Sequence, residues 1–182
     1  MTWTQFVPYP NHENLGSVVS CYLNEDKTLI KRVFTEGGIT SNGNPNQKSK
    51  DYIEQKWQTE SFILDKLSDE IFVPKLIEIN HAQRYTIQRY YGPDLLSRQF
   101  DDIADIEDQI CFAYRKIWDM GYYKMNGALA NMTRYGNRVI LFDFKYMKER
   151  SEEFRPYEEY SIDTWLSKVS NTMAPRLKKM LL

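Results

Sequence analysis

The period of the hydrophobic positions changes along this 182-residue chain, from the period of strands to that of a helix. Residues 15–34 alternate as two strands around the polar turn 24–27, which predicts a hairpin. A polar segment rich in Gly, Asn and Ser follows at 36–50 and is typical of a loop. Residues 51–67 then repeat with the helical period. The apolar face of that helix comprises Ile53, Trp57, Leu64 and Leu67.

Two more strands and a second helix are predicted in the middle of the chain. The strands are expected at 71–79 and 84–90, after which Gly92–Pro93 breaks the pattern. The helix is expected over 103–120, and Gly121 is favourably placed just beyond its C-terminus.

The last third of the chain predicts a hairpin and one more helix. The apolar run 139–142 is typical of a strand and ends at Asp143. A final helix is expected around 157–168, and Pro175 is expected to interrupt the tail.

One carboxylate falls within the apolar face of the first predicted helix. Glu60 lies three residues after Trp57 and four before Leu64, so the helical period points it toward the protein interior. A buried carboxylate is costly unless a cation meets it. We therefore expect a positively charged partner for Glu60.

The composition narrows the class of protein. Lys and Arg total 24 against 25 Asp and Glu, so the net charge of −1 disfavours nucleic acid as the main partner. No apolar run approaches the ~18 residues of a membrane span, and the first residues do not resemble a signal peptide. Two widely separated cysteines predict no disulfide framework. A cytoplasmic protein without a membrane span is expected.

The segment 121–144 places polar side chains around the predicted hairpin. Asn126 and Asn131 precede it, and Asp143–Phe144–Lys145 follows it. Taken singly, Asn126 and Asn131 are more typical of turns, and Asp143 is more typical of a strand end. Their order and spacing resemble the protein kinases, whose catalytic loop reads H-R-D-x-x-x-x-N and is followed by D-F-G. Lys124–Met125–Asn126 stands here in place of H-R-D.

The resemblance implies a role for each of these residues. Asn131 and Asp143 would be the ligands of Mg²⁺. Asn126 would occupy the position of the catalytic base, where an amide replaces the carboxylate.

Other segments match the family's nucleotide-binding motifs. Thr28–Leu29–Ile30–Lys31 resembles V-A-I-K, which implies that Lys31 contacts the phosphates of ATP and pairs with Glu60. Tyr90 and Tyr91 fall in the segment whose backbone would meet adenine. The glycine-rich loop would cover residues 11–18, where only Gly16 is kept.

The predicted fold is therefore α+β and protein-kinase-like, as one compact unit with two lobes. Residues 1–92 would form an N-terminal lobe with an antiparallel five-stranded sheet and one helix. Residues 93–182 would form a reduced, mainly helical C-terminal lobe.

Two functions are consistent with these residues. The first is a pseudokinase-type module that binds ATP and Mg²⁺ with weak or absent phosphoryl transfer, because Asn126, Lys145, the poor glycine loop and the short C-terminal lobe all depart from the family. The alternative is a small active kinase that transfers the γ-phosphoryl group to a protein, small-molecule, lipid or sugar hydroxyl. The acceptor and any partner protein are not specified by the sequence.

Overall fold

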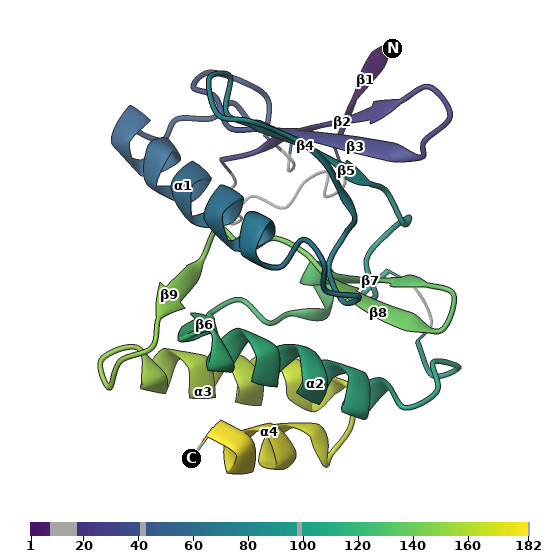
Figure 1. Ribbon diagram of the computed structural model, residues 1–182, viewed down its shortest axis with the longest axis vertical. Coiled ribbons are helices and arrows are strands. Elements are labelled where there is room, and N and C mark those ends of the chain that lie inside the picture. The colour runs from purple at the N-terminus through teal and green to yellow at the C-terminus, as the bar shows by residue number, and fades with distance from the viewer. Residues whose placement is uncertain (8–17, 41–42, 98–99, 182) are drawn as a thin grey trace. The chain divides into compact units, whose positions relative to one another are not determined.

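The computed structural model describes residues 1–7, 18–40, 43–97 and 100–181 (Figure 1). The described chain divides into two compact units. Unit 1 comprises residues 1–69 and 74–91, and unit 2 comprises residues 70–73 and 92–182.

Unit 1 contains an antiparallel five-stranded sheet with the strand order β1-β2-β3-β5-β4. The strands are β1 (Trp3–Phe6), β2 (Ser20–Asn24), β3 (Leu29–Val33), β4 (Leu76–Asn80) and β5 (Tyr85–Arg89). The hairpin predicted from residues 15–34 is confirmed as β2 and β3. The strand predicted at 71–79 is shorter and later than expected, and β1 was not recognised because four residues carry too little alternation.

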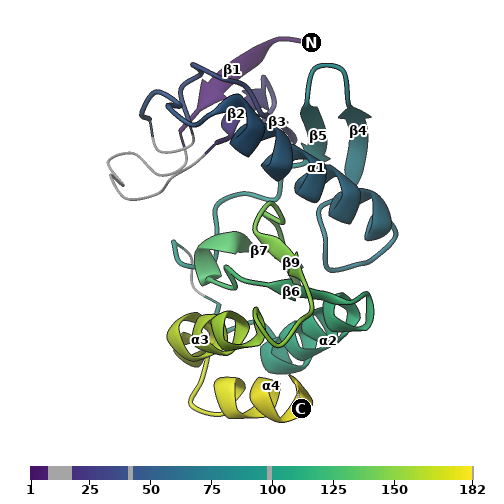
Figure 2. The ribbon, with the colours of Figure 1, turned by 90° about the vertical axis from the view of Figure 1, so that its left-hand side faces the viewer.

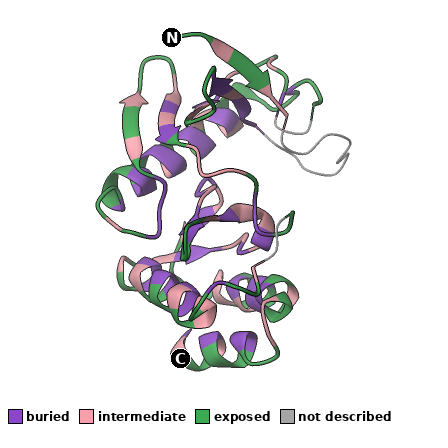
Figure 3. Ribbon diagram, turned by 90° about the vertical axis from the view of Figure 1, so that its right-hand side faces the viewer, coloured by how far each residue is buried: buried purple, intermediate pink, exposed green. Residues whose placement is uncertain are grey.

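The helix of unit 1 is α1 (Lys50–Lys66), which the apolar period predicted correctly. The Ser49 hydroxyl accepts a hydrogen bond from the backbone N–H of Tyr52 and so caps its first turn. Ile53 and Trp57 pack against Cys21 and Phe34, which forms the core of this unit. Figure 3 shows the resulting division of α1 into a buried and an exposed face.

Unit 2 is mainly helical and carries two small two-stranded sheets (Figure 2). Its helices are α2 (Ile106–Asp119), α3 (Arg155–Trp165) and α4 (Met173–Leu181), with single 3₁₀ turns η1 (Leu129–Asn131) and η2 (Leu166–Lys168). Its strands are β6 (Tyr122–Lys124), β7 (Met132–Tyr135), β8 (Arg138–Leu141) and β9 (Met147–Glu149). β6 pairs with β9, and β7 pairs with β8.

The pairing in unit 2 positions the polar residues identified in the sequence. The hairpin β7–β8 is confirmed, and it starts directly after Asn131 and ends two residues before Asp143. Phe142 N–H donates to the Asn131 carbonyl at 3.0 Å, so the two ends of the hairpin meet. The segment 70–73 also belongs here, because the Phe72 carbonyl accepts a hydrogen bond from Leu141 N–H at 2.7 Å.

The tail differs from the prediction at Pro175. This proline does not interrupt the chain but lies in the first turn of α4, where a missing N–H costs no intrahelical hydrogen bond. Across the described ranges, no helix combines the length and apolar character that crossing a membrane requires.

Candidate functional site

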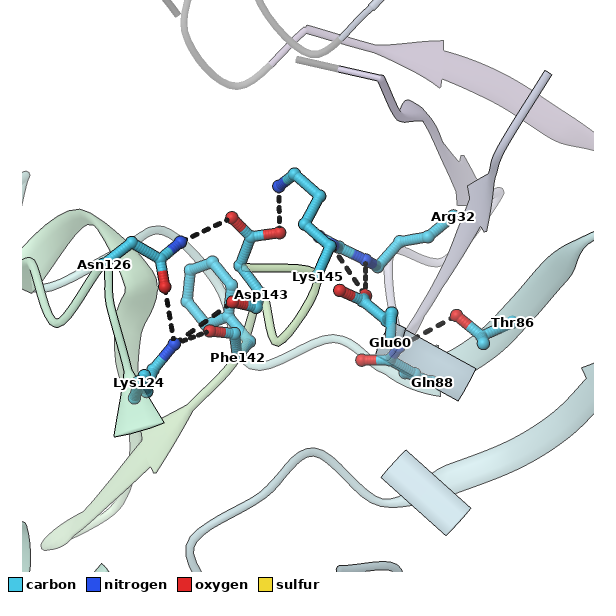
Figure 4. Close-up of polar contacts among 9 residues, drawn as sticks. All are labelled: Arg32, Glu60, Thr86, Gln88, Lys124, Asn126, Phe142, Asp143 and Lys145. Carbon is cyan, nitrogen blue, oxygen red and sulfur yellow. Dashed lines mark hydrogen bonds and ion pairs between the residues drawn. The ribbon is translucent and has the colours of Figure 1, made fainter. Parts of the chain in front are cut away.

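The residue that meets Glu60 is Arg32, and the predicted pairing of Glu60 with Lys31 is wrong. Arg32 Nη2 lies 2.8 Å from Glu60 Oε1, and Arg32 Nε donates to the same oxygen at 2.9 Å (Figure 4). Glu60 is 1% exposed and Arg32 is 8% exposed. The expected cation partner of this buried carboxylate is therefore present, but it is Arg32, the residue after Lys31.

The register of β3 explains this correction. Successive side chains of a strand point to opposite faces, so Lys31 and Arg32 cannot both face α1. Lys31 lies on the other face, with its Nζ 3.9 Å from the centre of the Tyr85 ring. Arg32 therefore forms the ion pair with Glu60 that the resemblance had implied for Lys31.

The other predicted residues of unit 1 lie as follows. Tyr90 N–H donates to the Thr28 carbonyl at 2.8 Å, and its ring packs edge-on against Phe6. Tyr91 is the last residue of unit 1 along the chain. Gly16 and most of the glycine-loop segment lie outside the described residues.

In unit 2, Lys124 joins the loop after β6 to the segment after β8. Its Nζ donates to the carbonyls of Phe142 and Asp143 at 3.0 and 3.1 Å, and to Asn126 Oδ1 at 3.3 Å (Figure 4). Lys124 is fully buried. An ammonium group has three N–H donors, so these three oxygens account for all of them. Lys124 was not singled out in the sequence, although it stands in the H-R-D slot.

Asn126, Asn131 and Asp143 are connected by hydrogen bonds. Asn131 Nδ2 donates to the Asn126 carbonyl at 2.7 Å, and Asn126 Nδ2 donates to Asp143 Oδ2 at 3.3 Å. Lys145 Nζ forms an ion pair with the other carboxylate oxygen, Asp143 Oδ1 (Figure 4). Asp143 itself has φ of 64°, a left-handed conformation that Asp adopts more readily than most residues.

Two side chains of helix α3 accept hydrogen bonds from the backbone at residues 124 and 127. Glu158 Oε1 accepts hydrogen bonds from Lys124 N–H at 3.2 Å and from Trp118 Nε1 at 3.0 Å. Three residues further along the helix, Ser161 Oγ accepts from Gly127 N–H at 3.0 Å. Sequence reasoning missed both side chains. Their i, i+3 spacing with buried Ile162 on one helix face was the available signal.

Glu158 lies in an environment that disfavours its charge. Burial raises the pKa of the Glu158 carboxyl to about 7, against the opposing effect of its hydrogen bonds to Trp118 and Lys124. Among the residues that the structure describes, its second oxygen has no hydrogen-bond partner, and neither does the buried hydroxyl of Tyr114. Burial and the charge of Glu158 both raise the pKa of Tyr114.

A divalent ion at Asp143, one of the Mg²⁺ ligands implied by the resemblance, would have to compete with the N–H donors that already contact this carboxylate. Mg²⁺ requires close, near-octahedral contacts with oxygen atoms. Both Asp143 oxygens instead accept N–H donors, one from Lys145 and one from Asn126. Within the described residues, no group of three or more His, Cys, Asp or Glu side chains is arranged to hold a metal ion.

The fold of the chain is protein-kinase-like, as the comparison with solved structures shows. Rio2 kinase from Chaetomium thermophilum in complex with ADP, Mg²⁺ and phosphoaspartate matches with a TM-score of 0.55 and 12% identity over 80% of this chain. A second crystal structure of Rio2 kinase from the same organism matches with a TM-score of 0.56 and 12% identity over 80% of this chain. WbdD bound to the kinase inhibitor LY294002 matches with a TM-score of 0.60 and 12% identity over 94% of this chain.

The chain spans half or less of the length of these proteins. It covers 49% and 50% of the two Rio2 chains and 37% of the WbdD chain. No protein-family model and no curated protein matches the sequence. The similarity in structure at 12% identity establishes the fold, and the function must be argued from the residues of this chain.

Proposed function

We propose that this protein binds a nucleoside triphosphate and transfers its γ-phosphoryl group weakly or not at all. The protein-kinase-like fold supports nucleotide binding as the inherited activity. The proposed loss of phosphoryl transfer rests on the identity of residue 126, which is an asparagine. Its amide stands at the position of the catalytic base, and an amide does not accept a proton at neutral pH.

The contacts of Asn126 strengthen this proposal. Its Nδ2 donates to Asp143 and its Oδ1 accepts from Lys124, so both ends of the amide are engaged. Loss of general-base catalysis lowers a rate by ~10²–10⁴-fold. Protein kinases turn over at ~1–100 s⁻¹, so the proposed residual rate lies well below that range.

Nucleotide binding is assigned to residues of unit 1 as well. Arg32 replaces Lys31 as the proposed phosphate ligand, because Glu60 holds its guanidinium where the family's helix glutamate holds a lysine. A guanidinium is well suited to phosphate because its planar donors match two phosphate oxygens at once. The backbone around Tyr90 and Tyr91 is the proposed adenine contact.

The test is a thermal-shift titration with ATP, paired with a radiolabelled γ-phosphoryl transfer and hydrolysis assay. ATP at 100 times its dissociation constant should stabilise the fold by ~2.7 kcal/mol. We expect this stabilisation with turnover far below ~1 s⁻¹. The absence of stabilisation at millimolar ATP contradicts nucleotide binding. Turnover within the ordinary kinase range supports instead an active small kinase, whose acceptor the same assay would identify.

A further inference from the structure

A lysine lies two residues after Asp143 and returns to contact its carboxylate. Lys145 occupies the third position of D-F-G, where the family has glycine. Its Nζ forms an ion pair with Asp143 Oδ1 (Figure 4). The same Nζ lies 4.9 Å from the centre of the Tyr146 ring. A carboxylate and an aromatic face both attract an ammonium group, so two neighbours hold this charge in place.

We propose that Lys145 supplies on Asp143 the positive charge that a divalent metal ion supplies in kinases, so that nucleotide binds here without the metal. This inference rests on the proposed nucleotide binding and specifies its cation requirement. The bound anion is a triphosphate, whose oxygens accept hydrogen bonds from an ammonium group as they do from the lysine of other phosphate-binding loops.

A metal ion and this ammonium group compete for Asp143. Mg²⁺ binds carboxylate oxygen at ~2.0–2.1 Å, so a metal ion on Asp143 Oδ1 would lie beside the Lys145 ammonium group that already pairs with this oxygen. Two positive charges side by side also repel. The second carboxylate oxygen already accepts a hydrogen bond from Asn126 Nδ2, and a metal ion there would still lie next to the charge of Lys145.

Lys124 is not the source of this charge. Its three N–H donors are directed to the carbonyls of Phe142 and Asp143 and to Asn126 Oδ1. It stabilises the backbone around Asp143, whereas Lys145 contacts the carboxylate itself. The two lysines therefore have different roles, and a substitution at 145 tests the proposal.

The first experiment measures ATP affinity by calorimetry in EDTA and in Mg²⁺. For the wild-type protein we expect dissociation constants within about threefold of each other in the two buffers. Lys145→Ala should weaken binding in EDTA by about tenfold or more, and Mg²⁺ should restore it. Lys145→Arg, which keeps the charge, should behave as wild type. Lys148→Ala is the matched control, because Lys148 lies over the Phe154 ring and its removal should change neither value.

The second experiment follows Mn²⁺ binding by electron paramagnetic resonance without nucleotide. Lys145→Ala should bind Mn²⁺ at least about tenfold more tightly than the wild-type protein, because the substitution frees Asp143 Oδ1. Lys145→Gln, which keeps the length of the side chain and removes its charge, replaces the alanine variant if the latter does not fold.

The outcomes separate the two proposals. ATP binding by the wild-type protein that requires Mg²⁺ overturns the role of Lys145 and leaves nucleotide binding intact. If ATP binds in neither buffer, the proposed function is overturned. The Mn²⁺ titration then tests separately whether Lys145 replaces a metal ion at Asp143. Equal Mn²⁺ affinity of wild type and Lys145→Ala overturns the replacement of the metal by lysine, whereas a gain only in the variant supports it.

Discussion

Arg32 and Glu60 form a buried ion pair in which two guanidinium nitrogens reach the same carboxylate oxygen. Nε lies 2.9 Å and Nη2 lies 2.8 Å from Oε1. The pair joins the centre of the sheet to α1, because Arg32 lies on β3 and Glu60 on the buried face of the helix. Breaking such a pair leaves one uncompensated charge in the interior, which is more costly than never burying the pair.

Arg32→Ala should therefore destabilise the protein by ~3–5 kcal/mol, because Glu60 stays buried without this partner. Lys31→Ala is the matched control on the same strand. It removes a charge over the Tyr85 ring and should cost only ~0.5–1 kcal/mol. Urea unfolding measures both values. Equal losses in the two variants would contradict the assignment of Arg32 as the partner of Glu60.

We expect ATP hydrolysis to rise only when residues 126 and 145 are both substituted. Asn126→Asp alone leaves Lys145 on Asp143 and places a second carboxylate beside it, so we expect no gain in ATP hydrolysis in Mg²⁺. The double variant Asn126→Asp with Lys145→Ala supplies a base and frees an oxygen for the metal. Its rate should rise by about tenfold or more over wild type.

Lys145→Ala alone is the control for that double variant. It should show metal binding without the rise in hydrolysis. A tenfold rise in Asn126→Asp alone would show that the missing base by itself limits the activity.

The stability of the protein should fall as the pH rises through the range set by Glu158. Its pKa is about 7 in the folded state against an ordinary value of 4.5, so between these values the folded protein holds a proton that the unfolded chain has released. Stability from this group is therefore complete below about pH 4.5 and is lost by about pH 7, amounting to at most about 3 kcal/mol.

Glu158→Gln isolates this contribution. The variant keeps an acceptor for Lys124 N–H and Trp118 Nε1 but does not titrate. Lys124 and Arg150 favour the charged carboxylate and Tyr114 faces it, so these groups stay common to both proteins. The difference in unfolding free energy between the two proteins should change between about pH 4.5 and 7. A constant difference would contradict the raised pKa.

A close approach at Gly127 gives a further prediction. A Cβ at this position would lie 1.9 Å from the Tyr114 hydroxyl, so Gly127→Ala should destabilise unit 2 by ~1–3 kcal/mol. Tyr114→Phe removes a buried hydroxyl that has no hydrogen-bond partner in the described part of the chain, so this substitution should be neutral or stabilising.

Combining the two substitutions tests the contact directly. The double variant should recover part of the loss, because the nearest remaining ring carbon would lie 3.2 Å from the new Cβ. Strictly additive losses in the unfolding experiment would show that the hydroxyl is not the obstacle.

Sequence period predicted the elements whose apolar spacing is long enough to be unambiguous. The helix α1 and the hairpins β2–β3 and β7–β8 are of this kind. Short elements such as β1 were not predicted, because four residues do not establish a hydrophobic period. Pro175 was misread because a proline in the first turn of a helix has the same local sequence as one that ends a segment.

The cation that pairs with Glu60 was assigned to the wrong residue of β3. Asn126 is hydrogen-bonded to both Asn131 and Asp143, and the roles of these three residues in binding stay a prediction. The exchange of Lys31 for Arg32 required the strand register, since a shift of one residue reverses the face and the sequence offers a cation on each side. Glu158 was one acid among several in α3, and only its packing distinguishes it.

The three hydrogen bonds of Lys124 have a consequence for the motion of unit 2. They fasten the end of β6 to residues 142 and 143, while β6 also pairs with β9. Local opening of β6 or of residues 142–143 alone would leave the buried Lys124 ammonium group without these acceptors. We therefore expect the two segments to open together as one cooperative unit. Amide protons in residues 122–124 and 147–149 would accordingly share a single opening free energy in hydrogen exchange.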